Sequence, residues 1–143
     1  MWLPDAILLK PGKLNPDEFK SIQRHPSIGG DAIMNVESKT KIQPFLTLGR
    51  EIAYCYHEKW DGTGYPKALK DEAIPLSARI VAIADVYDAL TSERSYKEAF
   101  PHKKALGIIA DSRATHFDPV IVDVFLDVEA EFDRIILSYQ EAE

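Results

Sequence analysis

Apolar residues in this chain recur mostly three and four positions apart, which is the spacing of an α-helix that buries one face. In one such segment, Leu48, Ile52 and Tyr56 fall four apart. The same spacing predicts helices at about 26–36, 44–57, 75–92, 101–113, 118–126 and 128–140. Strand-like alternation of polar and apolar residues is nearly absent, so the pattern predicts an all-α fold.

Polar residues mark one further helix start. In "NPDEFKSIQR", Asn15 suits the N-cap, Pro16 suits the first helical position, and Glu18 completes a capping box. Pro26 then interrupts this helix, because it has no amide hydrogen and restricts the residue before it. Asp118, which precedes a proline, is a similar cap for the helix at 118–126.

Residues 58–74 lack helical spacing and are crowded with Gly62, Gly64, Pro66 and charged side chains. They follow a histidine in "YHEKWDGTGYP", residues 56–66. Asp-Gly and Gly-Tyr-Pro are common turn sequences, so two interpretations stay open. The segment is either a turn between two helices or a loop that helps to hold a metal and a phosphate.

Composition narrows the class of protein. A chain of 143 residues fits one domain with a real core. The net charge of −6 argues against a general nucleic-acid-binding protein, although a local basic cluster can still bind a small anion. Cys55 is the only cysteine, which excludes an intrachain disulfide and a thiolate zinc site. We find no membrane-spanning run and no signal peptide, so we expect a cytoplasmic protein.

The helix at 75–92 carries two acids on one face, Asp85 and Asp88. The positions flanking that face are small or apolar: Ala78, Val81, Ala82, Ala89 and Ser92. We therefore expect both carboxylates to point inward beneath another helix. A buried carboxylate needs a cation, a metal or several hydrogen-bond donors, so a pair satisfied by Arg or backbone groups is an equal alternative.

His25, His57 and Asp85 have the residue types of a metal site. Two imidazoles and a carboxylate suit Fe, Mn or Zn. The alternatives are that His25 caps a helix end and that His57 is a core histidine. We expect His102 and His116 to be surface or capping residues, because nothing around them indicates metal ligation.

The stretch "TSERSYK" places two basic residues just beyond the acidic helix. Arg94 and Lys97 are in a position to meet phosphate oxygens, the first with a planar fork and the second with a point charge. Solvated side chains are the alternative for such a pair.

The joint pattern is more informative than any single motif. The segments "LPDAILLKPGKL", "RHPSIGGDAI", "HEKWDGTGYP", "IPLSARIVAIADVYDALTSERSYK" and "HFDP" resemble, in this order, those of the HD-GYP family. The resemblance covers essentially residues 3–126. It implies an HD-domain phosphohydrolase: an all-helical bundle with a metal site. HD-GYP proteins are bacterial phosphodiesterases that hydrolyse cyclic di-GMP to linear pGpG or GMP. They often follow a receiver or sensory domain, as in response regulators and other signal-transduction proteins.

The resemblance also implies a role for each matched acid and histidine. His25, His57 and Asp85 correspond to ligands of a bi- or trinuclear iron or manganese centre, and Asp88 to an acid behind those ligands. The implied chemistry is metal-assisted attack of a bridging water on phosphorus.

The same comparison implies the substrate contacts. Arg94 and Lys97 correspond to residues that bind the substrate phosphates. Tyr65 corresponds to the tyrosine of the loop that names the family; it shapes the pocket and contacts partner domains.

The chain departs from the family pattern at two places. The family's His-Asp pair and a nearby Lys precede the segment that matches "LPDAILLKPG", whereas this chain starts at Met1. The first of two family histidines is Tyr56 here, which we expect to be a packed aromatic, although tyrosine can ligate iron. We therefore expect residues 1–143 to be one HD-GYP-like domain, its C-terminal two-thirds, with reduced or absent metal and no complete catalytic set.

Two functional hypotheses follow. The first is a cyclic di-GMP phosphodiesterase whose N-terminal part is missing; retention of Asp85, Arg94 and Lys97 favours it. The second is a degenerate, non-catalytic module that binds a signalling partner or nucleotide, which Tyr56 favours. A helical domain with only ancestral resemblance is a third.

Missing N-terminal helices would leave apolar positions at 44–57 and 75–92 exposed. We therefore expect a homodimer. The alternative is that the helix at 128–140 folds back to cover these positions.

Overall fold

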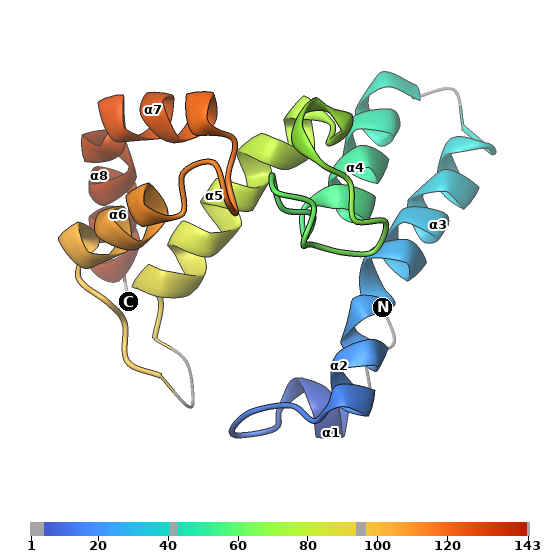
Figure 1. Ribbon diagram of the computed structural model, residues 1–143, viewed down its shortest axis with the longest axis horizontal. Coiled ribbons are helices and arrows are strands. Elements are labelled where there is room, and N and C mark those ends of the chain that lie inside the picture. Colours follow the sequence, from blue (N-terminus) through green and yellow to red (C-terminus); the bar gives the residue numbers. More distant parts are fainter. Residues whose placement is uncertain (1–4, 41–42, 94–96, 143) are drawn as a thin grey trace.

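The helices form two groups joined by one long helix (Figure 1). The computed structural model describes residues 5–40, 43–93 and 97–142. In chain order the helices there are α1 (Asp5–Leu8), α2 (Pro16–Gln23), α3 (His25–Glu37), α4 (Gln43–Cys55), the 3₁₀ turn η1 (Asp71–Ala73), α5 (Leu76–Thr91), α6 (His102–Asp111), α7 (Pro119–Asp127) and α8 (Glu129–Gln140). Over these ranges no strand is formed, which confirms the predicted all-α class.

The predicted helices lie within a few residues of their expected positions, with one difference that matters for the site. The helix predicted at 44–57 ends at Cys55. The chain turns there, because the Glu58 amide donates to the Cys55 carbonyl at 3.0 Å. Tyr56 and His57 therefore leave the helix and are free to face α3. The short helix α1 was not predicted.

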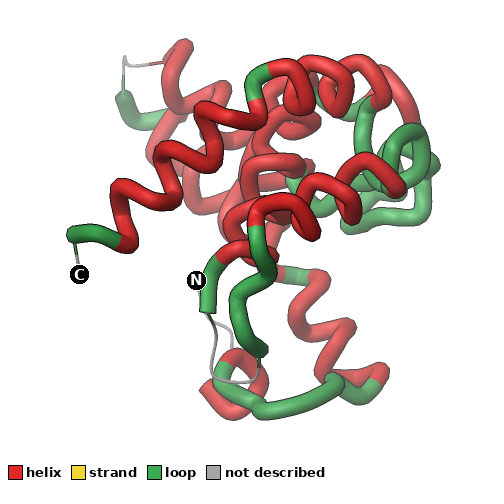
Figure 2. Tube along the Cα trace, turned by 90° about the vertical axis from the view of Figure 1, so that its left-hand side faces the viewer, coloured by secondary structure: helices red, strands yellow, loops and turns green. Residues whose placement is uncertain are grey.

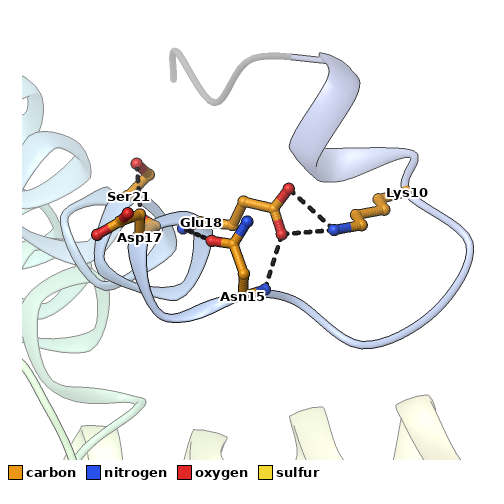
Figure 3. A network of polar contacts seen from close by, with 5 residues as sticks. All are labelled: Lys10, Asn15, Asp17, Glu18 and Ser21. Carbon is orange, nitrogen blue, oxygen red and sulfur yellow. Dashed lines mark hydrogen bonds and ion pairs between the residues drawn. The ribbon is translucent and has the colours of Figure 1, made fainter.

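The N-terminus of α2 has the predicted capping box (Figure 3). The Asn15 side chain accepts from the Glu18 amide at 2.8 Å, and the Glu18 carboxylate accepts from the Asn15 amide at 2.8 Å. Lys10 Nζ donates to the same carboxylate at 2.7 Å. The Lys10 hydrogen bond lowers the pKa of Glu18. This network fixes the entry into α2, which leads directly to His25.

Helices α3 and α4 lie side by side (Figure 1). A view turned by 90° shows helices and loops and no strand among the described residues (Figure 2). A glycine makes the close approach of α3 and α4 possible. A Cβ atom on Gly30 would meet the Tyr54 ring at 2.4 Å, well inside van der Waals contact. The approach brings the start of α3 next to the end of α4.

The second group packs α6, α7 and α8 against α5. Its buried core comprises Ala82, Ile83, Tyr87, Ala105, Ile109, Phe117, Val122 and Phe125. Phe132 and Ile136 of α8 pack against this core. Asp118 caps α7 as predicted, accepting from the Val120 amide at 2.9 Å. Among the residues described, no helix is both long and apolar enough to cross a membrane.

Candidate metal centre

Three side chains with nitrogen or oxygen donor atoms converge where α3 begins and α4 ends. His25 is the first residue of α3 and is 8% exposed. Tyr56 and His57 follow the last residue of α4. His25 Nε2 lies 2.9 Å from the Tyr56 hydroxyl and 2.9 Å from His57 Nε2. Two residues that are 32 positions apart in the sequence are thus in direct contact.

The other ring nitrogen of His25 is held by the backbone. Nδ1 lies 2.5 Å from the Ile22 carbonyl oxygen. A carbonyl oxygen can only accept, so Nδ1 carries a proton and donates. In metal-binding histidines the remote N–H commonly makes this kind of contact, which orients the ring and leaves the other nitrogen available as a ligand.

His57 is kept neutral by its surroundings. Burial, together with smaller effects of the nearby His25 and His116, lowers its pKa to about 4. The Tyr65 ring stacks on the His57 ring with centroids 4.9 Å apart and planes at 23°. A neutral imidazole has a lone pair to offer a metal, so burial favours ligation at neutral pH.

The loop that carries Tyr65 is fastened by a buried acid that the sequence did not single out. Glu58 is 2% exposed, and its carboxylate accepts from the amides of Lys67 at 2.7 Å and Leu69 at 3.0 Å. These two amides bracket Ala68, whose φ is +52°. The Glu58 carboxylate therefore closes the loop behind Tyr65. An acid next to His57 was the only signal in the sequence.

Gly64 explains why the loop needs a glycine before its tyrosine. A Cβ at this position would meet the Lys59 amide nitrogen at 2.4 Å and the His57 carbonyl oxygen at 2.5 Å. These are backbone atoms that cannot rotate away, so a larger residue would lift the loop. The close approach lets the Tyr65 amide donate to the His57 carbonyl at 3.3 Å. The loop thus packs closely against His57.

The far side of the loop is anchored to the segment before α7. The Trp60 amide donates to the His116 carbonyl at 3.0 Å. The His116 ring stacks on Phe117 with centroids 4.1 Å apart, and burial lowers its pKa to about 4. His102 is also half-buried, with Nδ1 2.9 Å from the Tyr87 hydroxyl. Surface or capping positions were expected for both histidines, and the surface position is wrong for both.

Asp85 and Asp88 are exposed, so the expectation that both point beneath another helix is wrong for this chain. Helices α6 and α7 pack on the side of α5 that carries Ala82, Ile83 and Tyr87. Asp88 accepts from the Ser92 hydroxyl at 3.2 Å.

Asp85 nevertheless acts on the site electrostatically. Burial, together with smaller effects of the charges of Tyr56 and Asp85, raises the pKa of Tyr65 to about 12. Burial and then Asp85 also raise the pKa of Tyr56. The Asp85 carboxylate is thus near enough to both phenols to raise their pKa values.

Two of the three predicted metal ligands, His25 and His57, are in contact in the structure. Within residues 5–40, 43–93 and 97–142, no group of three or more His, Cys, Asp and Glu side chains is arranged to hold a metal. His25 and His57 lie together, with Tyr56 as the third donor, while Asp85 lies within electrostatic range of Tyr56.

Of the two predicted phosphate-binding residues, Lys97 is among the residues that the structure describes. Lys97 Nζ donates to the carbonyls of Ala89 at 3.2 Å and Leu90 at 3.3 Å, near the end of α5. It also lies 4.2 Å from the Phe100 ring centroid. Arg94 lies outside the described residues.

Comparison with known proteins gives a consistent result. A family model described as "HD domain" matches residues 1–121. A cyclic di-GMP phosphodiesterase of Vibrio cholerae is 51% identical over 140 residues, which are 98% of this chain and 28% of the relative. The cyclic di-GMP phosphodiesterase response regulator RpfG of Xanthomonas campestris pv. campestris is 44% identical over 140 residues, which cover 98% of this chain and 36% of that protein.

A solved structure shares the fold. The cyclic GMP-AMP specific phosphodiesterase of V. cholerae is 28% identical, with a TM-score of 0.61 over 87% of this chain and 27% of that chain. The chain thus spans about a third or less of the length of the relatives it matches.

Proposed function

Because this chain belongs to the HD domain family, in its HD-GYP branch, we propose that it forms the C-terminal two-thirds of a metal-dependent domain that hydrolyses cyclic di-GMP. The observation that carries the proposal is the 2.9 Å approach of His25 Nε2 and His57 Nε2 beneath Tyr65. Ligands at about 2.1 Å from one metal and about 90° from each other are about 3.0 Å apart. The imidazole pair therefore fits two neighbouring positions on one metal ion.

His25 and His57 would hold the metal ion through Nε2, and Asp85 would complete the set from α5. Imidazole and carboxylate ligands suit iron and manganese. When bound, the metal ions would supply a deprotonated water and neutralise charge that develops at phosphorus. Asp88, one turn beyond Asp85, would lie behind the Asp85 carboxylate and support it. Asp88 would not bind the metal itself.

Tyr65 and Lys97 would contact the substrate, together with Arg94. With a pKa of about 12, the Tyr65 phenol keeps its proton and is a hydrogen-bond donor at neutral pH. Lys97 would exchange its two backbone carbonyls for a phosphate oxygen, which is a stronger acceptor because it is charged.

We further propose that residues 1–143 on their own hydrolyse cyclic di-GMP at or near background, even with added Mn²⁺ or Fe²⁺. Two imidazoles and one nearby carboxylate are too few protein ligands for two or three metal ions. Chromatography of the nucleotide products measures this directly. Robust turnover that the Asp85→Ala variant loses would contradict the prediction.

A chimeric protein distinguishes the two hypotheses, namely a fragment of an active enzyme and a degenerate, non-catalytic module. In it, this chain replaces the matching segment of the 51% identical V. cholerae relative. We expect the chimera to convert cyclic di-GMP to a linear product, and its Asp85→Asn variant to return to background. Asp111→Asn, an exposed acid on α6, is the matched control and should keep full turnover.

The alternative function is a non-catalytic module that binds a nucleotide or a signalling partner. Tyr56 favours it, because the family pattern has a histidine there. An inactive chimera that still binds cyclic di-GMP by calorimetry would support this alternative over the phosphodiesterase.

The relatives also guide the proposed context. One of them is described as a response regulator, so we propose that this domain follows a receiver or sensory domain in the whole protein. Cys55 is free and buried, which suits a reducing compartment, and we propose that the protein acts in the cytoplasm.

We propose that two copies of the chain associate through an apolar groove between α4 and α5. The groove has a volume of about 480 Å³ and is lined by Leu48, Glu51, Ile52, Leu76, Ser77, Ile80 and Val81. Leu48, Leu76 and Ile80 are about half exposed. At roughly 25 cal/mol per Å², covering a few hundred Å² of such surface contributes several kcal/mol. Helix α8 does not cover it, because α8 packs on the α5–α7 core.

Sedimentation velocity at micromolar concentration tests this association. We expect a dimer for the chain and a monomer for Ile80→Glu, because a charge in the apolar groove must be desolvated on association. Val124→Glu is the matched control, an exposed apolar residue on α7. A monomer of the unaltered chain, or a dimer that survives Ile80→Glu, would count against the proposal.

A further inference from the structure

Tyr56 has a position that packing alone does not explain. Its ring lies beside the His57 ring, with centroids 4.0 Å apart. Its hydroxyl reaches past that ring to within 2.9 Å of His25 Nε2. The same nitrogen lies 2.9 Å from His57 Nε2. One nitrogen therefore has two polar neighbours at hydrogen-bond distance.

The hydrogen-bonding capacity of that nitrogen is too small for both neighbours. His25 Nδ1 donates to the Ile22 carbonyl, so Nε2 of the neutral ring has a single lone pair. In the protonated ring, Nε2 has a single hydrogen instead. In either state, one lone pair or one hydrogen faces both the Tyr56 hydroxyl and His57 Nε2. One lone pair or hydrogen shared between two neighbours makes a weaker bond to each, so a further partner would stabilise this arrangement.

A cation bound next to His25 Nε2 would give this nitrogen, the Tyr56 hydroxyl and His57 Nε2 a common partner. Each atom then directs a lone pair at the ion in place of sharing one hydrogen. Both measured separations, 2.9 Å and 2.9 Å, match the spacing of neighbouring ligands on one metal ion, about 3.0 Å. The donor set is two imidazole nitrogens and one phenol oxygen.

We propose that Tyr56 is a metal ligand in this chain, which forms a His₂Tyr site with His25 and His57. The inference rests on the proposed metal-dependent function and adds Tyr56 to the protein ligands proposed for it. On binding, the phenol O–H bond breaks, the oxygen bonds to the metal, and the proton leaves to solvent. An anionic oxygen ligand favours a hard ion, and the site therefore suits Fe³⁺.

Iron bound to a phenolate is coloured, which gives a readout that does not depend on activity. The chain is loaded with one equivalent of Fe²⁺ and oxidised in air, and its iron content is measured. We expect a visible phenolate-to-iron charge-transfer band, with tyrosinate modes in the resonance Raman spectrum. We expect Tyr56→Phe to lose this band and Tyr65→Phe to keep it, because the Tyr65 phenol belongs to the covering loop.

Tyr56→His provides a second variant that keeps a donor atom at this position. We expect it to bind iron without the band, and circular dichroism shows that each variant is folded. Bound iron without a band in the unaltered chain, or a band that persists in Tyr56→Phe, would overturn the ligand role while leaving the proposed metal site. A chain that takes up no iron would overturn both.

Discussion

Replacing Arg79 with methionine is expected to lower the free energy of unfolding by about 3–5 kcal/mol, because it strands a buried charge. Arg79 Nη1 lies 2.7 Å from Asp118 Oδ2, and the Asp118 side chain is 4% exposed. The other carboxylate oxygen of Asp118 caps α7. Methionine keeps most of the arginine stem but leaves the carboxylate without its cation. Urea denaturation at pH 7, followed by circular dichroism, measures the loss.

The chain offers a matched control on its surface. Arg113 and Asp123 form a bidentate pair of the same chemistry, at 2.8 Å, but both side chains are about half exposed. Solvent screens this pair, so Arg113→Met should lower the free energy of unfolding much less than Arg79→Met does. Equal losses in the two variants would contradict the argument that burial of Asp118 makes the difference.

The Arg79–Asp118 pair also supports the candidate site. Both residues line a small internal cavity together with Glu58, Trp60, His116 and others. Glu58 fastens the loop that carries Tyr65, and Trp60 anchors the same loop to His116. Loss of the ion pair would therefore loosen the support beneath the loop as well as the core.

The helices could be predicted from the sequence because their signals are local. The Asn15 cap, Glu18 and the apolar spacing all act within one or two turns, and the structure has the capping box that they predict. Helix α1 was missed because four residues are too few to show a period. The end of α4 was missed because the turn at Glu58 depends on contacts with a loop farther along the chain.

The acids of α5 show what a periodic pattern cannot specify. Ala78 lies almost two full turns before Asp85, on nearly the same face. Ala78 is fully buried against Cys55 and Ile74, whereas Asp85 is exposed. A periodic pattern gives the direction of a side chain around the helix axis. It does not give how far along the axis the neighbouring elements pack on that face. For this reason Asp85 and Asp88, in the second half of α5, are exposed although the pattern predicts their burial.

The candidate site itself was predicted only in part. His25 and His57 came from family resemblance, since no local pattern connects residues 32 positions apart. Tyr56 was expected to be a packed aromatic, and its hydroxyl in fact lies at hydrogen-bond distance from His25. Glu58 was missed because its partners, the amides of Lys67 and Leu69, are defined only once the loop has folded.

Acid is expected to destabilise the metal-free chain well above the pH at which carboxylates titrate. Burial lowers the pKa of His57 and of His116 from 6.5 to about 4. The unfolded chain therefore binds more protons than the folded chain between these values, so stability falls as pH falls through this window. Well above pH 6.5 both histidines are neutral in both states, and the full stability is present.

Between pH 7 and pH 5, the free energy of unfolding is expected to fall by about 2 kcal/mol for each histidine. Urea denaturation at the two pH values measures it, with a chelator present so that metal binding does not hold His57 neutral. His116→Gln removes one of the two titrating groups and should reduce the pH-dependent loss by about half. His57→Gln should do the same, since the two rings are shifted by similar amounts. Equal stability of the unaltered chain at pH 7 and pH 5 would show that the two imidazoles are not buried in their neutral form.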